Sequence, residues 1–140
     1  MLLAARDYTT ARLREKLIVK AFTEEDADSV VTTLTVEGWV DDRRFAERFA
    51  ESAVASGRFY GPRLRQEMRR RGVPADLIDE LLGRIREEHD EVEKAAAILA
   101  RRYSDFSFLS SSDKEKRRII GFLQRRGFAI AAVMQALREK

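Results

Sequence analysis

The sequence predicts an all-α protein made of three tandem three-helix repeats that form an elongated modular array. Three observations carry this prediction. Charged residues make up 36% and hydrophobic residues 44% of the 140-residue chain, and only two prolines and seven glycines interrupt it, a mixture that suits helices with large exposed faces. Apolar residues recur three and four positions apart, without strand-like alternation of any length. Finally, one basic amphipathic motif occurs three times.

That motif is R-[LI]-x3-[LM]-x3-[AG]-[FV], and its copies, offset by 51 and 55 residues, begin at Arg12, Arg63 and Arg118. Each copy predicts a helix that ends at a small residue suited to a helix C-terminus: Ala21, Gly72 and Gly127. Helical patterns precede and follow each copy, which gives three units at residues 1–40, 41–87 and 88–140. Because such small units bury little apolar surface alone, they must stack on their neighbours, and this predicts the elongated body.

The first unit (residues 1–40) has a shortened leading helix at residues 2–8, followed by the first copy of the motif. Its third helix begins behind the cap residue Thr23 and carries apolar side chains at helical spacing: Val30, Val31 and Leu34. The joint to the second unit, residues 36–42, is short and structured.

The second unit (residues 41–87) begins with a helix whose two ends are both marked. Gly38 tolerates a positive φ ahead of it, and the carboxylates of Asp41 and Asp42 can accept hydrogen bonds from amides of its first turn. Three apolar residues spaced by four predict one buried stripe: Phe45, Phe49 and Ala53. The helix should end near Gly57.

The next helix carries the densest positive charge of the chain. Gly61-Pro62 opens it, since proline at the first helical position loses no hydrogen bond that the helix would make, and Leu64 and Met68 face inward. Six arginines stand here against the single acid Glu67: Arg58, Arg63, Arg65, Arg69, Arg70 and Arg71. This density attracts phosphate or an acidic protein surface, and the alternative is a solvated helix face. The third helix follows Pro74.

The third unit (residues 88–140) contains the loose segment 104–112. Ser112 and Glu115 have capping-box spacing for the helix that follows, and three apolar residues should tuck beneath that helix: Phe106, Phe108 and Leu109. The helix bears a second set of basic residues: Lys116, Arg117, Arg125 and Arg126. The last helix begins behind Ala129, with Val133, Met134 and Leu137 on its apolar face.

Charge and composition point to binding rather than catalysis. The formal net charge of +3 conceals −4 in residues 1–42, +5 in residues 43–86 and +2 in residues 87–140. The chain has no cysteine, no apolar run near the ~20 residues of a membrane span and no glycine-rich phosphate loop, so we expect a soluble cytoplasmic protein without disulfides or membrane contact. We interpret His89 as a solvated residue and Asp41 with Asp42 as a cap instead of a metal pair, and we predict no enzymatic activity and no cofactor.

Two aromatic residues could have a role in binding. Phe59 and Tyr60 lie between arginines in the link before Gly61-Pro62, where rings can stack on bases or anchor a protein interface. Packing against Leu64 is the preferred interpretation. The remaining large aromatic residues occupy helical or cap positions and are expected in the core: Trp39, Phe45, Phe49, Phe122 and Phe128.

Three stretches, GWVDDRRFAERFAES, FYGPRLRQEMRRRGV and the closing QRRGF, resemble the RecX family of bacterial regulators of the RecA recombinase. The resemblance covers nearly the whole chain and implies the three-unit fold. It also implies a binding protein that lodges along the groove of a RecA–DNA filament, spans neighbouring protomers, and restrains recombination, ATP hydrolysis and co-protease activity. We expect the protein to be a monomer.

The arginine-rich surfaces described above are the candidate RecA- or DNA-binding residues, with direct contact to single- or double-stranded DNA possible. They comprise Arg58, Arg63, Arg65, Arg69, Arg70, Arg71, Lys116, Arg117, Arg125 and Arg126. Two other functions fit the residues alone. One is a sequence-independent DNA-binding helical protein whose arginines track phosphates, and the other is a helical adaptor with an unrelated partner.

Overall fold

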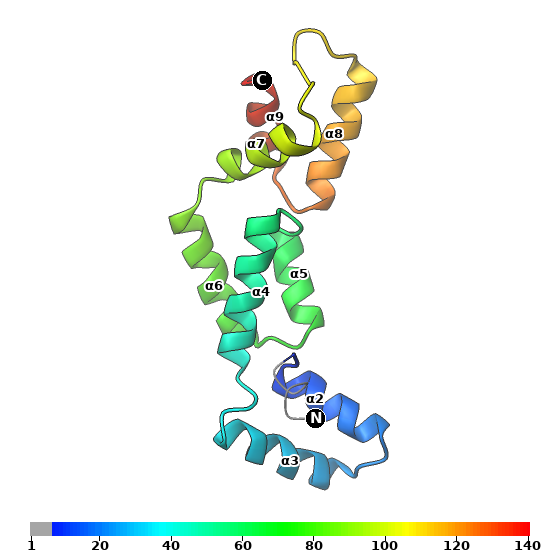
Figure 1. Ribbon diagram of the computed structural model, residues 1–140, viewed down its shortest axis with the longest axis vertical. Coiled ribbons are helices and arrows are strands. Elements are labelled where there is room, and N and C mark those ends of the chain that lie inside the picture. Colours follow the sequence, from blue (N-terminus) through cyan, green and yellow to red (C-terminus); the bar gives the residue numbers. More distant parts are fainter. Residues whose placement is uncertain (1–6) are drawn as a thin grey trace. The chain divides into compact units, whose positions relative to one another are not determined.

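The structure, a computed structural model, describes residues 7–140, and every regular element in that range is an α-helix (Figure 1). The helices are α2 (Thr10–Val19), α3 (Glu24–Val36), α4 (Asp42–Ser56), α5 (Gly61–Arg70), α6 (Ala75–Glu88), α7 (Glu91–Arg102), α8 (Asp113–Arg125) and α9 (Ile130–Arg138). The all-α class is therefore confirmed, and the three copies of the basic motif form α2, α5 and α8. The predicted helix at residues 2–8 falls mostly outside the described residues, and Asp7 and Tyr8 form a turn and a bend.

The helix ends follow the local sequence signals. Thr23 Oγ1 accepts a hydrogen bond from Asp26 N at 3.0 Å, and Ser112 Oγ accepts one from Glu115 N at 3.1 Å, as their cap positions predict. The small residues that end the three motif helices all hold a positive φ: Ala21 at 75°, Gly72 at 88° and Gly127 at 107°.

The two aspartates before α4 have separate roles. Asp41 Oδ1 accepts from Arg44 N at 3.1 Å and caps α4, as predicted. Asp42 instead caps a different helix, because its two carboxylate oxygens accept from Thr10 N at 2.8 Å and Thr10 Oγ1 at 2.9 Å. Asp42 lies in the first turn of α4, and its carboxylate accepts hydrogen bonds from the start of α2, where backbone amides have no partner within their own helix.

Contacts divide the chain into two compact units, each made of two sequence segments. Unit 1 comprises Met1–Ala50 and Glu67–Leu81, and unit 2 comprises Glu51–Gln66 and Leu82–Lys140. Helices α4, α5 and α6 each contribute residues to both units.

Within unit 1, α2 packs against α3 around a small apolar cluster of Leu13, Leu17, Ala27 and Val40. The fully buried hydroxyl of Thr9 donates to the carbonyl oxygen of Arg71 at 2.5 Å. A Cβ added to Gly72 would lie 2.6 Å from that hydroxyl oxygen, so this turn needs glycine for its space as well as for its φ.

Within unit 2, the last helix α9 packs against α7 and α8. Each of the three helices buries two large aliphatic side chains: Ile98 and Leu99 of α7, Ile119 and Leu123 of α8, and Val133 and Leu137 of α9. The predicted apolar face of the last helix is thereby confirmed at Val133 and Leu137, while Met134 is half-buried.

The predicted buried stripe of α4 was partly wrong. Phe45 and Phe49 are only half-buried and stack on each other, with ring centroids 6.2 Å apart, while the fully buried positions are small: Ala46, Ala50, Ala53 and Val54. The Arg71 guanidinium lies 4.4 Å from the centroid of Phe49 and covers that ring from outside. The buried face is therefore rotated by one position, with small side chains where backbones can approach closely.

The three apolar residues predicted to pack beneath α8 from segment 104–112 differ in their burial. Phe106 is buried as predicted, and Phe108 is half-buried beneath the Lys116 ammonium, 4.1 Å from its ring centroid. Leu109 is 95% exposed, so its predicted burial was wrong. Among the apolar residues of this segment, Phe106 and Phe108 are therefore the ones that are removed from solvent.

A basic pocket as the candidate functional site

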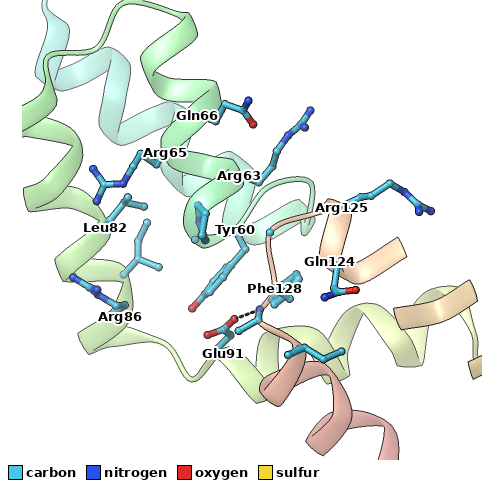
Figure 2. A pocket seen from close by; sticks show the side chains of 16 residues that line it. Tyr60, Arg63, Arg65, Gln66, Leu82, Arg86, Glu91, Gln124, Arg125 and Phe128 are labelled. Atoms are coloured by element: carbon cyan, nitrogen blue, oxygen red, sulfur yellow. Dashed lines mark hydrogen bonds between the residues drawn. The ribbon is translucent and has the colours of Figure 1, made fainter. Parts of the chain in front are cut away.

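A pocket of about 680 Å³ lies within unit 2 and is shown in Figure 2. We call it the basic pocket. Four arginines line it: Arg63, Arg65, Arg86 and Arg125. Two glutamines, Gln66 and Gln124, and one acid, Glu91, complete its polar groups. Its apolar lining is mainly aliphatic and includes Pro62, Leu82, Ile85 and Ile130.

The ends of five helices bring these side chains together, namely the starts of α5, α7 and α9 and the ends of α6 and α8. The first turns of α5 supply Arg63 and Arg65, the last turns of α6 supply Ile85 and Arg86, and the end of α8 supplies Arg125. In Figure 2 the ring of Tyr60 lies in the middle of the pocket, with Arg65 and Arg86 extending to one side and Arg63 and Arg125 to the other.

The pocket is built on a joint between two turns that are far apart in the sequence. Tyr60 N donates to the carbonyl oxygen of Arg126 at 2.7 Å, and Arg126 Nη1 donates to the carbonyl oxygen of Gly57 at 2.8 Å. A Cβ added to Gly127 would overlap the carbonyl oxygen of Tyr60 and lie 2.8 Å from Arg63 Cβ, so only glycine permits this approach. We call this arrangement the turn joint.

Tyr60 and Phe128 line the pocket next to the turn joint. Their rings stack with centroids 4.8 Å apart and planes 8° from parallel, and the residues are only 5% and 3% exposed. Burial raises the pKa of the Tyr60 hydroxyl above its usual value, and the negative charges of Glu91 and Asp90 raise it further. The hydroxyl therefore stays neutral and adds no charge to the pocket at neutral pH. Tyr60 is buried, in agreement with the preferred packing interpretation, but its stacking partner is Phe128, and Phe59 is only half-buried.

The one acid of the pocket lining is already engaged. Glu91 Oε2 accepts a hydrogen bond from Ala129 N at 2.8 Å, shown as the dashed line in Figure 2. Ala129 is the N-cap of α9 and has no side chain that could cap it, so Glu91 from the start of α7 satisfies this end. The Glu91 carboxylate is therefore engaged at the N-terminus of α9, and in the described part of the chain it forms no ion pair with Arg63, Arg86 or Arg125.

Three of the four pocket arginines, Arg63, Arg86 and Arg125, keep much of their hydrogen-bonding capacity. In the described part of the chain, no ion pair joins Arg63, Arg86 or Arg125 to an acidic residue, and Arg63 Nε is buried without a hydrogen-bond partner. The half-buried ring of Phe59 lies between Arg58 and Arg63, whose guanidinium carbons are 5.4 and 5.5 Å from its centroid. The site thus combines a cationic rim with an aliphatic base.

The structure distributes the ten candidate residues over several environments. Arg63, Arg65 and Arg125 line the basic pocket, whereas Arg58, Arg69 and Arg117 are exposed outside it. Arg70 and Arg71 pair with the buried Glu67 at 3.2 and 3.6 Å. The Lys116 ammonium covers Phe108.

Arg126 has a structural role, because its side chain donates a hydrogen bond to the Gly57 carbonyl oxygen. It holds the turn joint, and its guanidinium carbon lies 4.6 Å from the centroid of Phe122. Burial lowers its pKa, and the neighbouring charges of Arg102, Arg58 and Arg101 lower it further. Arg102 makes a second cation contact with this half-buried ring, at 4.3 Å from its centroid.

Sequence reasoning missed Arg86 and Glu91 as members of the site. Both lie near the charged segment between α6 and α7, where their polarity gave no sign of a pocket. The only available signal was that Arg86 is separated from Leu82 by four residues, which places it on the same side of α6.

These features define a class: an all-α protein of small helical units with a pocket lined by arginines. Among residues 7–140 there is no group of three or more histidine, cysteine, aspartate or glutamate residues arranged to hold a metal ion. In the same range no helix combines the length and apolar character needed to cross a membrane.

Comparison with known proteins identifies the family. Models of the second and third three-helix domains of RecX match residues 41–82 and 89–137. A regulatory protein RecX from Trichlorobacter lovleyi is 44% identical over 134 residues, covering 96% of this chain and 87% of the relative. Another from Thermus thermophilus is 37% identical over 138 residues, covering 98% and 85%. The chain belongs to the RecX family.

The fold agrees with a solved member of that family. The crystal structure of RecX from Lactobacillus salivarius matches with a TM-score of 0.73 over 98% of this chain and 88% of that chain, at 17% sequence identity. At this identity the match concerns the fold alone.

Proposed function

We propose that this protein binds RecA–DNA filaments and regulates them, mainly by inhibition, so that recombination, ATP hydrolysis and co-protease activity are restrained. Membership of the RecX family supports the role. The observation that carries it to named residues is the basic pocket, where, among residues 7–140, Arg63, Arg86 and Arg125 have no acidic partner and the acid of the lining caps a helix. Such a surface attracts an anionic partner, and the forked donors of arginine suit carboxylates and phosphates alike.

Regulation of this kind needs no bond chemistry. A protein that binds one state of a filament more tightly than another shifts the population toward the bound state. If the bound state hydrolyses ATP or exchanges strands slowly, occupancy of the filament lowers the rates of both. We propose units at residues 1–40, 41–87 and 88–140 as the repeating elements that contact neighbouring protomers, which the positions of the two matched domains support.

One titration tests the function. Purified protein is added to RecA hydrolysing ATP on single-stranded DNA, and the steady-state rate should fall as the protein saturates the filament. An unchanged rate at saturating protein, together with unchanged strand exchange, would contradict the proposal.

The same titration tests the site. Arg86→Glu with Arg125→Glu should raise the concentration needed for half-inhibition by about tenfold or more, because like charges then oppose the partner at two points of the rim. The matched control is Arg118→Glu with Arg138→Glu, two exposed arginines outside the pocket, which should change it by about twofold or less. Equal effects of the two pairs would place the contact elsewhere.

A sequence-independent DNA-binding protein is the second candidate, because the forked donors of the pocket arginines also suit phosphates. Binding of the same two double variants to naked DNA separates the two functions. A pocket variant that loses DNA binding and still inhibits RecA fully would show that the pocket is a DNA site and not the filament contact.

A further inference from the structure

The base of the basic pocket is more apolar than a phosphate site needs. Leu82, Ile85 and Ile130 line it together with Pro62. Ile130 is 48% exposed, although Val133 and Leu137 on the same helix are fully buried. An aliphatic lining residue of a pocket of about 680 Å³ that stays half in water is a place where a second apolar side chain gains by burial.

The aromatic rings of the pocket are not available for nucleobases. Proteins that hold single-stranded nucleic acid without sequence preference commonly stack bases on exposed ring faces. Tyr60 and Phe128 stack on each other and are 5% and 3% exposed, so neither offers a face of that kind. A duplex would present phosphates to the arginines and would leave the aliphatic base uncovered.

The arginines of the pocket favour a negatively charged ligand, and the aliphatic residues of its base favour an apolar side chain of that ligand. Carboxylates can pair with Arg63, Arg86 and Arg125 around the mouth of the pocket, and the amides of Gln66 and Gln124 can hydrogen-bond to a peptide backbone. A protein segment is the polymer that places both kinds of group within a few residues of each other. Recognition of acidic motifs by clustered arginines is an established mode of peptide binding.

We infer that the basic pocket binds an acidic protein segment that inserts one leucine-like side chain onto its aliphatic base. The inference rests on the proposed function, since it specifies which face of the partner filament the pocket meets: protein and not DNA. Affinity depends on both the carboxylates and the central apolar residue, and removal of either weakens binding.

The test uses a fluorescein-labelled short peptide of glutamates with one central leucine, and fluorescence anisotropy at about 0.15 M salt. A second peptide with serine in place of the leucine should bind the wild-type protein about tenfold more weakly, because the apolar contact is lost. This comparison needs no protein variant and so is independent of any effect on folding. Equal affinity of the two peptides, or no binding of the leucine peptide, overturns the inference.

Two protein variants locate the binding. Arg125→Glu and Ile130→Ser should each weaken the leucine peptide by about five- to tenfold. Their controls are Arg118→Glu on the same helix α8 and Leu109→Ser, whose side chain is 95% exposed outside the pocket. Controls that weaken binding as much as the pocket variants overturn the location. A labelled oligothymidylate that binds at this salt and competes fully with the peptide would assign the pocket to nucleic acid and overturn the inference as well.

Failure of the inference and failure of the proposed function give different results. A peptide that binds a protein unable to inhibit RecA leaves the pocket assignment standing and removes the filament function. If the protein inhibits RecA while the peptide does not bind, the function stands and the pocket assignment falls. Relief of RecA inhibition by saturating leucine peptide, but not by serine peptide, supports both.

Discussion

Ala21 is the one residue with a side chain that holds a positive φ in the described part of the chain, at 75°. The equivalent positions of the other two motif copies are Gly72 and Gly127. A left-handed conformation costs an L-residue about 1–2 kcal/mol, and glycine avoids this cost while losing more conformational entropy on folding. We expect Ala21→Gly to raise the free energy of unfolding by about 0.5–1 kcal/mol in urea denaturation. Because Ala21 is exposed, a lower stability of the variant would contradict the assigned backbone conformation.

At Gly127, in contrast to Ala21, the structure leaves no room for a side chain. Since its Cβ would overlap the carbonyl oxygen of Tyr60, Gly127→Ala forces the turn joint apart and should lower the free energy of unfolding by about 2–4 kcal/mol. The matched control is Gly83→Ala inside α6, where an added Cβ meets no atom within 4 Å. That substitution should stabilise the protein by about 0.5–1 kcal/mol because alanine favours the helix. Thermal and urea denaturation of both variants check the pair, and equal effects at the two glycines would refute the close approach.

At the scale of helices, the bond between α4 and α2 through Asp42 couples two segments of unit 1. Asp42→Ala removes both hydrogen bonds to Thr10 and should cost about 1–2 kcal/mol of unfolding free energy. Thr10→Ala removes only the hydroxyl bond and should cost less. The double variant should show a coupling energy of about 0.5–1 kcal/mol in a double-mutant cycle, while strictly additive costs would mean that the two residues act separately.

The helices were predictable to the extent that their signals are local. Thr23, Asp41 and Ser112 cap the helices that follow them, and Gly61-Pro62 opens α5, because each signal acts within one turn of backbone. The partners of Asp42 and Glu91 were not predictable, since each accepts from an amide more than 30 residues away. The sequence around a carboxylate near the start of a helix does not indicate which helix that carboxylate caps.

The faces of the helices were less predictable than their ends. On α4 the larger side chains Phe45 and Phe49 suggested the buried stripe, yet the alanines beside them are the residues in contact with the interior. Periodicity identifies an apolar side of a helix to within about one residue position, or 100° of arc. Whether a phenylalanine or its smaller neighbour lies at the centre depends on the distance to the next helix. The cation that covers Phe49 comes from Arg71, in another part of the sequence.

For the whole molecule, the sequence indicated a basic binding surface and left its location open. Arg63, Arg65 and Arg125 belong to the pocket, but Arg86 was overlooked, and Arg126, which has the same charge as Arg125, lies in the fold of the turn joint. Charge density alone cannot separate an arginine that faces solvent from one that satisfies a carbonyl oxygen. That distinction requires the position of Gly57, which is 69 residues earlier in the chain.

The uneven charge of the whole chain leads to a prediction for naked DNA. With residues 43–86 at a net charge of +5, any binding to DNA should depend on counterion release. Raising salt from about 50 to 200 mM should then weaken binding by tenfold or more, with nearly equal affinity for unrelated sequences. Fluorescence anisotropy on two duplexes of different sequence measures both properties. A preference for one sequence that survives the higher salt would indicate base recognition and contradict the proposed roles of the arginines.

The turn joint also sets an order of events during synthesis of the protein. Tyr60 leaves the ribosome well before Phe128, and at about 5–20 residues per second the intervening stretch takes several seconds to make. Throughout that interval the Tyr60 ring lacks its stacking partner and the Gly57 carbonyl oxygen lacks the Arg126 donor. The middle of the chain is therefore born with an unfinished apolar surface that only the C-terminal helices can cover. We expect a chain released at that stage to be cleaved by proteases faster than the full-length chain, because those contacts are missing.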